Sequence, residues 1–174
     1  MSHVTIFVIG LLLWTCSSAA VPPSVPRPLA QQVERLSQLL KDRHAEWYSD
    51  ATMVQIVKSG AQRELALVVF TVEGLGGGNN HNQYFAVFDV NREDKFSPAY
   101  TLVDVMRVGG KGWRAVDKLG ARLAQTAKGS DLAIDIDALE VTPKDAPNFP
   151  TRKIVIHLLL RDGRLSEKGR WRSQ

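Results

Sequence analysis

Two stretches of the chain would be apolar on both faces as β-strands, and this feature limits the fold more than any other. In residues 65–72, Leu65, Leu67 and Val69 would point to one side and the equally apolar residues between them to the other. Residues 154–160 show the same pattern. Such strands need cover on both sides. The sequence therefore predicts a sheet with a helix on one face and a second sheet, a curled continuation or a partner on the other.

One helix is predicted, from Leu29 to about Tyr48. Apolar residues recur at helical spacing on one face, and charged and amide side chains cover the other. The apolar face consists of Leu29, Val33, Leu36, Leu40 and Trp47. Four prolines lie between residues 21 and 28. Pro28 suits the first turn of the helix, because its missing N–H is not needed there.

The rest of the chain is typical of successive antiparallel strands joined by short turns. The strand-like segments are residues 52–58, 64–73, 83–90, 99–108, 122–127, 131–141 and 153–161. Residues 114–123 could form a helical turn. We expect an α+β fold, with the N-terminal helix packed on a curved antiparallel sheet of about six to seven strands. A cystatin-like or nuclear-transport-factor-like arrangement, a small sandwich and a small barrel all agree with this pattern.

The first 20 residues are predicted to be a signal peptide. Residues 4–14 are apolar and uncharged, and too short to span a bilayer as a helix, which needs about 20 residues. Ser18 and Ala20 then suit a signal-peptidase cut before Val21. This indicates a bacterial protein that is periplasmic or secreted and not transmembrane once cleaved. The alternative is a lipid anchor on Cys16. A cut after Ala20 leaves no cysteine, hence no disulfide and no thiolate.

The mature chain is predicted to have three parts: a Pro-rich N-terminal arm at residues 21–28, a single α+β domain at 29–165 and a basic C-terminal tail at 166–174. The formal net charge of +4 is concentrated toward this tail. The tail could contact anionic envelope polymers or lipid head groups, or it could simply be a solvated terminus. Nucleic acid is not expected as a partner, because no aromatic platform accompanies the basic residues.

Two glycine-rich loops make the most informative candidate site. One follows residues 64–73 and the other follows residues 99–108, with one strand between them. In an antiparallel meander, the first and third strands run the same way, so both loops leave the sheet at the same end. Glycine permits close backbone approach, and free N–H groups can bind anions. The candidate ligand- or partner-binding residues are Gly77, Gly78, Asn79, Asn80, His81, Lys111, Trp113 and Arg114.

These loops could hold an envelope protein, a glycan or a small anion, with Trp113 suited to a sugar ring and Arg114 to an anion. Glycine and asparagine are also what turns require, so a purely structural role explains the same residues. The segment at Gly74 is not a phosphate loop or a dinucleotide-binding fingerprint, since no Gly-Lys-Ser/Thr is present and no helix pattern follows.

Other polar residues give weaker signals. Asp131, Asp135 and Asp137 alternate along a predicted strand, which suggests a solvent-facing side more than a calcium or acid–base site. Of the mature histidines, His44 is expected on the helix surface and His157 half-buried among apolar residues. None has a second histidine or cysteine at metal-binding spacing. No metal, cofactor or catalytic residue is therefore predicted.

Two segments resemble parts of small exported bacterial proteins of unknown function. They are Gly76-Gly77-Gly78-Asn79-Asn80, followed by residues 83–88, and Val108-Gly109-Gly110-Lys111-Gly112-Trp113-Arg114. The resemblance covers roughly residues 63–165. It implies a cell-envelope setting and a compact β-rich domain, and it carries no known activity. Cysteines associated with the loop before the last strand in such proteins are absent from residues 142–152 here.

The leading hypothesis is a non-catalytic binding or inhibitor-like module that uses the glycine-rich loop end. One alternative is a cell-envelope hydrolase using Asp135, Asp137 or His81. The other is a structural accessory protein that docks through its basic tail. A hydrolase requires a cleft with converging acids or histidines. A binding module requires only an accessible site at the loop end.

Overall fold

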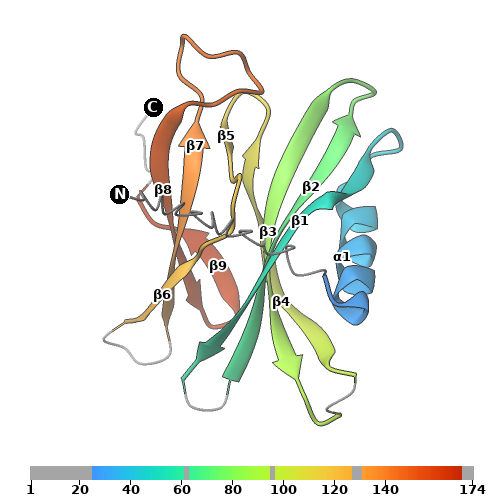
Figure 1. Cartoon of the computed structure of the whole chain (residues 1–174), viewed down its shortest axis with the longest axis vertical. Coiled ribbons are helices and arrows are strands. Elements are labelled where there is room, and N and C mark those ends of the chain that lie inside the picture. Colours follow the sequence, from blue (N-terminus) through green and yellow to red (C-terminus); the bar gives the residue numbers. More distant parts are fainter. Residues whose placement is uncertain (1–24, 61–62, 95–96, 127–130, 170–174) are drawn as a thin grey trace, which may run out of the picture.

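The computed structural model describes residues 25–60, 63–94, 97–126 and 131–169 (Figure 1). The predicted signal peptide, Cys16 and residues 170–174 of the predicted tail lie outside these ranges. Among the described residues, no helix is both long and apolar enough to cross a bilayer.

The helix α1 runs from Arg27 to Leu40 and has a proline in its first turn, as Pro28 predicted. Its buried side includes Leu29, Val33 and Leu36. The predicted continuation to Tyr48 is wrong, because the chain turns after Leu40 and enters a strand at residue 46. Trp47 therefore contributes its apolar side chain from a strand and not from the helix.

In the described part of the chain, nine strands follow in one antiparallel sheet (Figure 1). They are β1 (Glu46–Ser59), β2 (Arg63–Leu75), β3 (Asn80–Asn91), β4 (Ala99–Gly110), β5 (Arg114–Ala115), β6 (Arg122–Gln125), β7 (Leu132–Glu140), β8 (Arg152–Arg161) and β9 (Arg164–Glu167). The order is β1-β2-β3-β4-β5-β7-β8-β9, with β6 also paired to β7. The α+β class is confirmed. The strand number exceeds the expected six to seven because the sheet includes β5 and β9, which are too short to show a strand pattern in the sequence. β5 occupies the start of the segment 114–123, for which the sequence also allowed a helical turn.

The sheet curls so that its two halves face each other (Figure 1). A first apolar core joins β2, β3 and β4 to β7 and β8. A second core lies between the opposite face of β1–β4 and helix α1. β2 is buried on both faces from Leu65 to Val72, as its sequence predicted. In β8 the prediction holds only in part, because Val155 and His157 are exposed.

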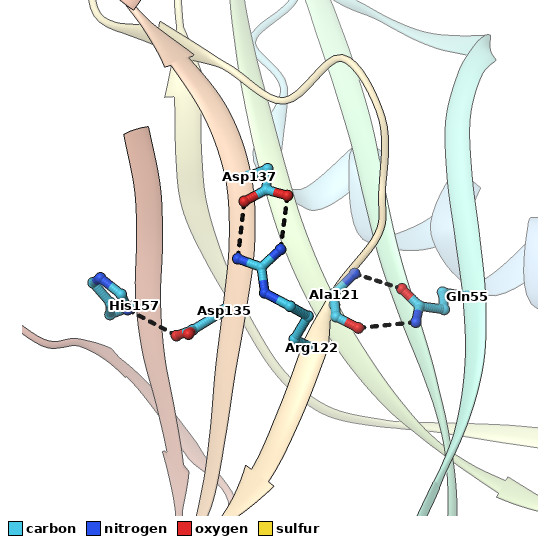
Figure 2. A network of polar contacts seen from close by, with 6 residues as sticks. All are labelled: Gln55, Ala121, Arg122, Asp135, Asp137 and His157. Carbon is cyan, nitrogen blue, oxygen red and sulfur yellow. Dashed lines mark hydrogen bonds and ion pairs between the residues drawn. The ribbon is translucent and has the colours of Figure 1, made fainter. Parts of the chain in front are cut away.

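Besides the strand pairing through β5, hydrogen bonds from side chains connect the two halves of the sheet. The Gln55 amide exchanges two hydrogen bonds with the backbone of Ala121, at 2.7 and 3.0 Å (Figure 2). The buried Gln83 amide makes the same pair of bonds with Val116, at 2.7 and 3.1 Å. Residues 116–121, which link β5 to β6, are therefore held at both ends. On the far side, Asp104 accepts a hydrogen bond from the Leu165 N–H at 2.7 Å.

Candidate functional site

The two glycine-rich loops meet at one end of the sheet. β2, β3 and β4 form the predicted antiparallel meander. The turn after β2 and the turn after β4 therefore leave the sheet together. Lys111 connects them directly: its backbone N–H donates to the His81 carbonyl at 3.2 Å, and its ammonium donates to the Asn79 side chain.

A third loop, between β7 and β8, completes this end of the molecule. The Gly112 N–H donates to the Pro147 carbonyl at 2.8 Å, and the Val141 N–H donates to the Trp113 carbonyl at 2.8 Å. These bonds bring residues 141–151 against the second glycine turn. Phe149, two residues after Pro147 in this loop, leaves 73% of its surface exposed. The loop end thus presents an exposed aromatic ring beside polar turns.

A pocket of about 510 Å³ lies among these segments. Its side chains are almost all capable of hydrogen bonding, and they come from the helix–β1 connection, the β2–β3 hairpin and the β7–β8 loop. The lining residues are His44, Glu46, Glu73, Gly74, Gly78, Asn79, His81 and Asn148. Carboxylates, imidazoles and amides can together accept and donate hydrogen bonds to a polar ligand. We call this cavity the loop-end pocket.

Three of these side chains form a row across the sheet. Glu46 on β1 is opposite Glu73 on β2, and Glu73 is opposite His81 on β3. Residues directly opposite each other in neighbouring strands share a face. Two carboxylates in this arrangement repel each other. Lys41 offsets the repulsion by donating to both carboxylate oxygens of Glu46, at 2.9 Å each.

Asp42 fixes one wall of the loop-end pocket. Its carboxylate accepts hydrogen bonds from the N–H groups of Gly76 at 2.8 Å, His44 at 2.8 Å and Ala45 at 3.0 Å. These bonds join the turn after α1 to the glycine hairpin. The bond from Gly76 is the largest cause that lowers the pKa of Asp42, because the bond favours the charged carboxylate.

Asp145 fixes the β7–β8 loop, which supplies Asn148 to the lining. Within the β7–β8 loop, its carboxylate accepts hydrogen bonds from the Thr142 N–H at 2.7 Å, the Thr151 hydroxyl at 2.9 Å and the Thr151 N–H at 3.2 Å. The bond from the Thr142 N–H is the main cause that lowers the pKa of Asp145. One ionised carboxylate therefore closes this loop, which carries Asn148 to the pocket.

The structure brings most of the predicted site residues together. Gly78, Asn79 and His81 line the loop-end pocket, and Lys111 holds the Asn79 side chain. Gly77 lies near the His44 ring, and the Asn80 amide donates to the Leu75 carbonyl at 3.2 Å.

The candidate residues from the sequence do not include five of the eight lining residues: His44, Glu46, Glu73, Gly74 and Asn148. The helix predicted to reach Tyr48 includes His44 and Glu46, and this places both residues away from the loops. Glu73 offered a usable signal, since it is the last residue of a predicted strand before a glycine loop. Asn148 lies between two prolines, Pro147 and Pro150, in a loop with no other mark of function.

Arg114 does not lie where a ligand-facing cation would be, whereas Trp113 is half-buried. Arg114 leaves only 1% of its surface exposed. Its guanidinium donates to both carboxylate oxygens of Glu167, at 2.7 and 2.8 Å, and to the Val108 carbonyl. The same guanidinium lies 4.1 Å from the centre of the Trp113 ring, and that of Arg107 lies 5.2 Å from it. Arg114 is thus an interior connector between β4, β5 and β9, and not an anion-binding group.

The acidic strand residues do not converge on a site. Asp131 is buried against Arg161, whereas Asp135 and Asp137 project from β7 (Figure 2). Asp137 is ion-paired with Arg122 at 2.7 Å, and this guanidinium lowers the pKa of Asp137.

His157 is solvent-exposed, not half-buried as predicted. One ring nitrogen lies 2.8 Å from Asp135 (Figure 2). His44, expected on the helix surface, lies in the turn after α1 and accepts a hydrogen bond from Arg43 at 2.8 Å. Within the described ranges, no group of three or more histidine, cysteine or acidic residues is arranged to hold a metal ion.

A second pocket, of about 600 Å³, lies over β7 and β8. Ala138, Leu139, Ile154 and Val155 supply its apolar lining. Charged residues of both signs surround these groups: Asp117, Lys118, Asp137 and Lys153. We call it the β7–β8 pocket.

Comparison with models of protein families, with curated proteins and with solved structures found no match for this chain.

Proposed function

We propose that the chain is an exported, non-catalytic binding module whose loop-end pocket takes a carbohydrate. The observation that carries the proposal is the lining of that pocket. Carboxylates, imidazoles and amides from the ends of β1, β2 and β3 and from the adjoining loops surround one cavity, and Phe149, the residue after Asn148, is exposed. Sugars offer many hydroxyl groups that both donate and accept hydrogen bonds, and an apolar ring face that packs on aromatic side chains.

The charges of the pocket favour neutral or amine-bearing sugars over anions. Glu46 and Glu73 both line it, and the buried Arg114 that was expected to attract an anion is paired with Glu167. An acidic sugar or a phosphate would meet two carboxylates. The small-anion ligand considered from the sequence is therefore not part of the proposal.

The two alternative functions have less support. Asp135 and Asp137 do not converge, because each carboxylate contacts a different basic partner. A hydrolase would therefore have to use His81, which lines the loop-end pocket together with His44, Glu46 and Glu73. The lowered pKa of Asp137 also keeps that group charged, which does not suit a general acid. Docking through the basic tail gains no specific observation, and part of the predicted tail, Ser166 and Glu167, belongs to β9.

The test is a binding titration with neutral sugars, amino sugars and uronic acids, in which calorimetry measures the affinity. We expect Glu73→Gln to weaken binding of a neutral sugar by roughly tenfold, because a hydrogen bond to a charged group contributes about 1.5–3 kcal/mol and one to the neutral amide that replaces it about 0.5–1.5 kcal/mol. The matched control is Glu93→Gln, an exposed carboxylate beyond the opposite end of β3. Equal affinities for Glu73→Gln and wild type, or a preference for uronic acids, would overturn the proposal.

A further inference from the structure

Residues 152–157 of β8 have an edge with no neighbouring strand in the described part of the chain. On one side of β8, residues 152–160 pair with β7. On the other side, β9 pairs only with residues 158–161. The last bond on this side runs from the Lys168 N–H to the His157 carbonyl, at 2.8 Å. Since every second residue of a strand directs its backbone groups to the same side, those of Val155 and Lys153 point toward this open edge.

The β7–β8 pocket lies beside the same edge. Lys153, Ile154 and Val155 belong both to the pocket and to the unpaired stretch of β8. Val155 leaves 38% of its surface exposed. Open apolar strand edges invite pairing with other chains, and proteins usually cover or interrupt them.

The described chain stops beside this edge. Lys168 is hydrogen-bonded to β8, and Gly169 follows with φ 94°, a conformation in which the backbone can change direction. The next residues are Arg170, Trp171 and Arg172. Two residues of extended chain span about 7 Å, which is also the distance along β8 from His157 to Val155. Trp171 is therefore within reach of the β7–β8 pocket.

We propose that the β7–β8 pocket is the docking site of the chain's own segment 170–172, with the Trp171 side chain as its occupant. The apolar lining suits an indole ring, and Asp117 at the rim can face a flanking arginine. Asp137 is already ion-paired with Arg122, and Lys118 and Lys153 limit the electrostatic gain. The docked segment covers the open edge of β8. A partner strand can then reach that edge only by displacing the segment.

The experiment measures amide hydrogen exchange by NMR on the full chain. In the wild type, the Val155 and Lys153 amides exchange slowly because the docked segment shields them. Trp171→Ala lowers their protection at least tenfold, whereas Trp171→Phe, which keeps an aromatic ring, retains most of it. Phe149→Ala is the matched control, because it removes an exposed aromatic ring from another loop and leaves these two amides unchanged.

Three results overturn the proposal. The first is exchange of the Val155 amide at the rate of an unstructured chain in the wild type. The second is equal protection in wild type and Trp171→Ala. The third is protection that rises with protein concentration, because this indicates that the segment docks on a second copy. None of these readouts involves the loop-end pocket, so failure here leaves the carbohydrate proposal untouched.

Discussion

Replacing Arg114 by alanine tests whether this residue stabilises the fold instead of binding a ligand. The substitution removes two hydrogen bonds to Glu167 and one to the Val108 carbonyl. It leaves a carboxylate that is only 19% exposed without its cation. Removing one partner of a buried ion pair costs about 3–5 kcal/mol. Because Glu167 keeps some contact with water, we expect a loss of about 3 kcal/mol.

Thermal unfolding provides the assay. For a domain of this size, each kcal/mol shifts Tm by about 2–4 °C, so Arg114→Ala should lower Tm by roughly 6–12 °C. Arg107→Ala is the control, since Arg107 also lies over Trp113 but is exposed. It should change Tm by about 2 °C or less. In a double-mutant cycle, Arg114→Ala and Glu167→Ala should show a coupling energy of about 2 kcal/mol.

A specific outcome would refute this reasoning. If Arg114→Ala melts at the wild-type temperature and yet loses sugar binding, the guanidinium acts on the ligand and the ion pair is incidental. The stability argument requires the opposite result. Below its Tm, the variant should bind the ligand of the loop-end pocket with wild-type affinity, because Arg114 does not line that pocket.

Two further predictions concern the walls of the loop-end pocket. Gly74→Ala should lower the free energy of unfolding by about 1–3 kcal/mol, because φ is 85° there and the new Cβ would lie 2.9 Å from the His44 carbonyl oxygen. In Gly78→Ala the new Cβ meets no atom within 4 Å, so the free energy of unfolding, measured with urea, should be nearly unchanged. The lowered pKa values of Asp42 and Asp145 mean that their stabilisation is present above the ordinary carboxyl pKa of about 3.9 and is lost as pH falls through the folded values. An Asp42→Asn/Asp145→Asn variant should therefore lose less stability than wild type between pH 5 and pH 2, and parallel pH curves would contradict this.

The sequence was sufficient for the features that follow from strand direction. The meander of β2, β3 and β4 requires both glycine loops to leave at one end, and His81, Asn79 and Lys111 do meet there. The end of the helix was mispredicted because Trp47 continues the helical spacing. The opposing signal is Asp42, whose short carboxylate can bond to the N–H groups of His44 and Ala45 and so form a turn.

Contacts between distant residues could not be predicted from local patterns. Arg114 and Glu167 are separated by 53 residues, and nothing near either residue indicates its partner. β5 has two residues and β9 has four, too few to show strand periodicity. Of the missed lining residues, Glu46 and Glu73 are neighbours within the β1–β2 hairpin, whereas Asn148 comes from the β7–β8 loop and joins them only when the sheet curls. Local patterns in the sequence indicate the loop end but not the composition of its cavity.

The two glutamine contacts that hold residues 116–121 have a consequence for how the domain folds. Gln55 lies 66 residues from Ala121 and Gln83 lies 33 residues from Val116, so neither contact helps to start folding. Contacts of such long range pay a large loop-closure entropy before they form. We therefore expect the hairpins β1–β2 and β7–β8 to assemble first, with residues 116–121 joining last. A Gln83→Leu substitution should accordingly accelerate unfolding and leave the rate of folding nearly unchanged.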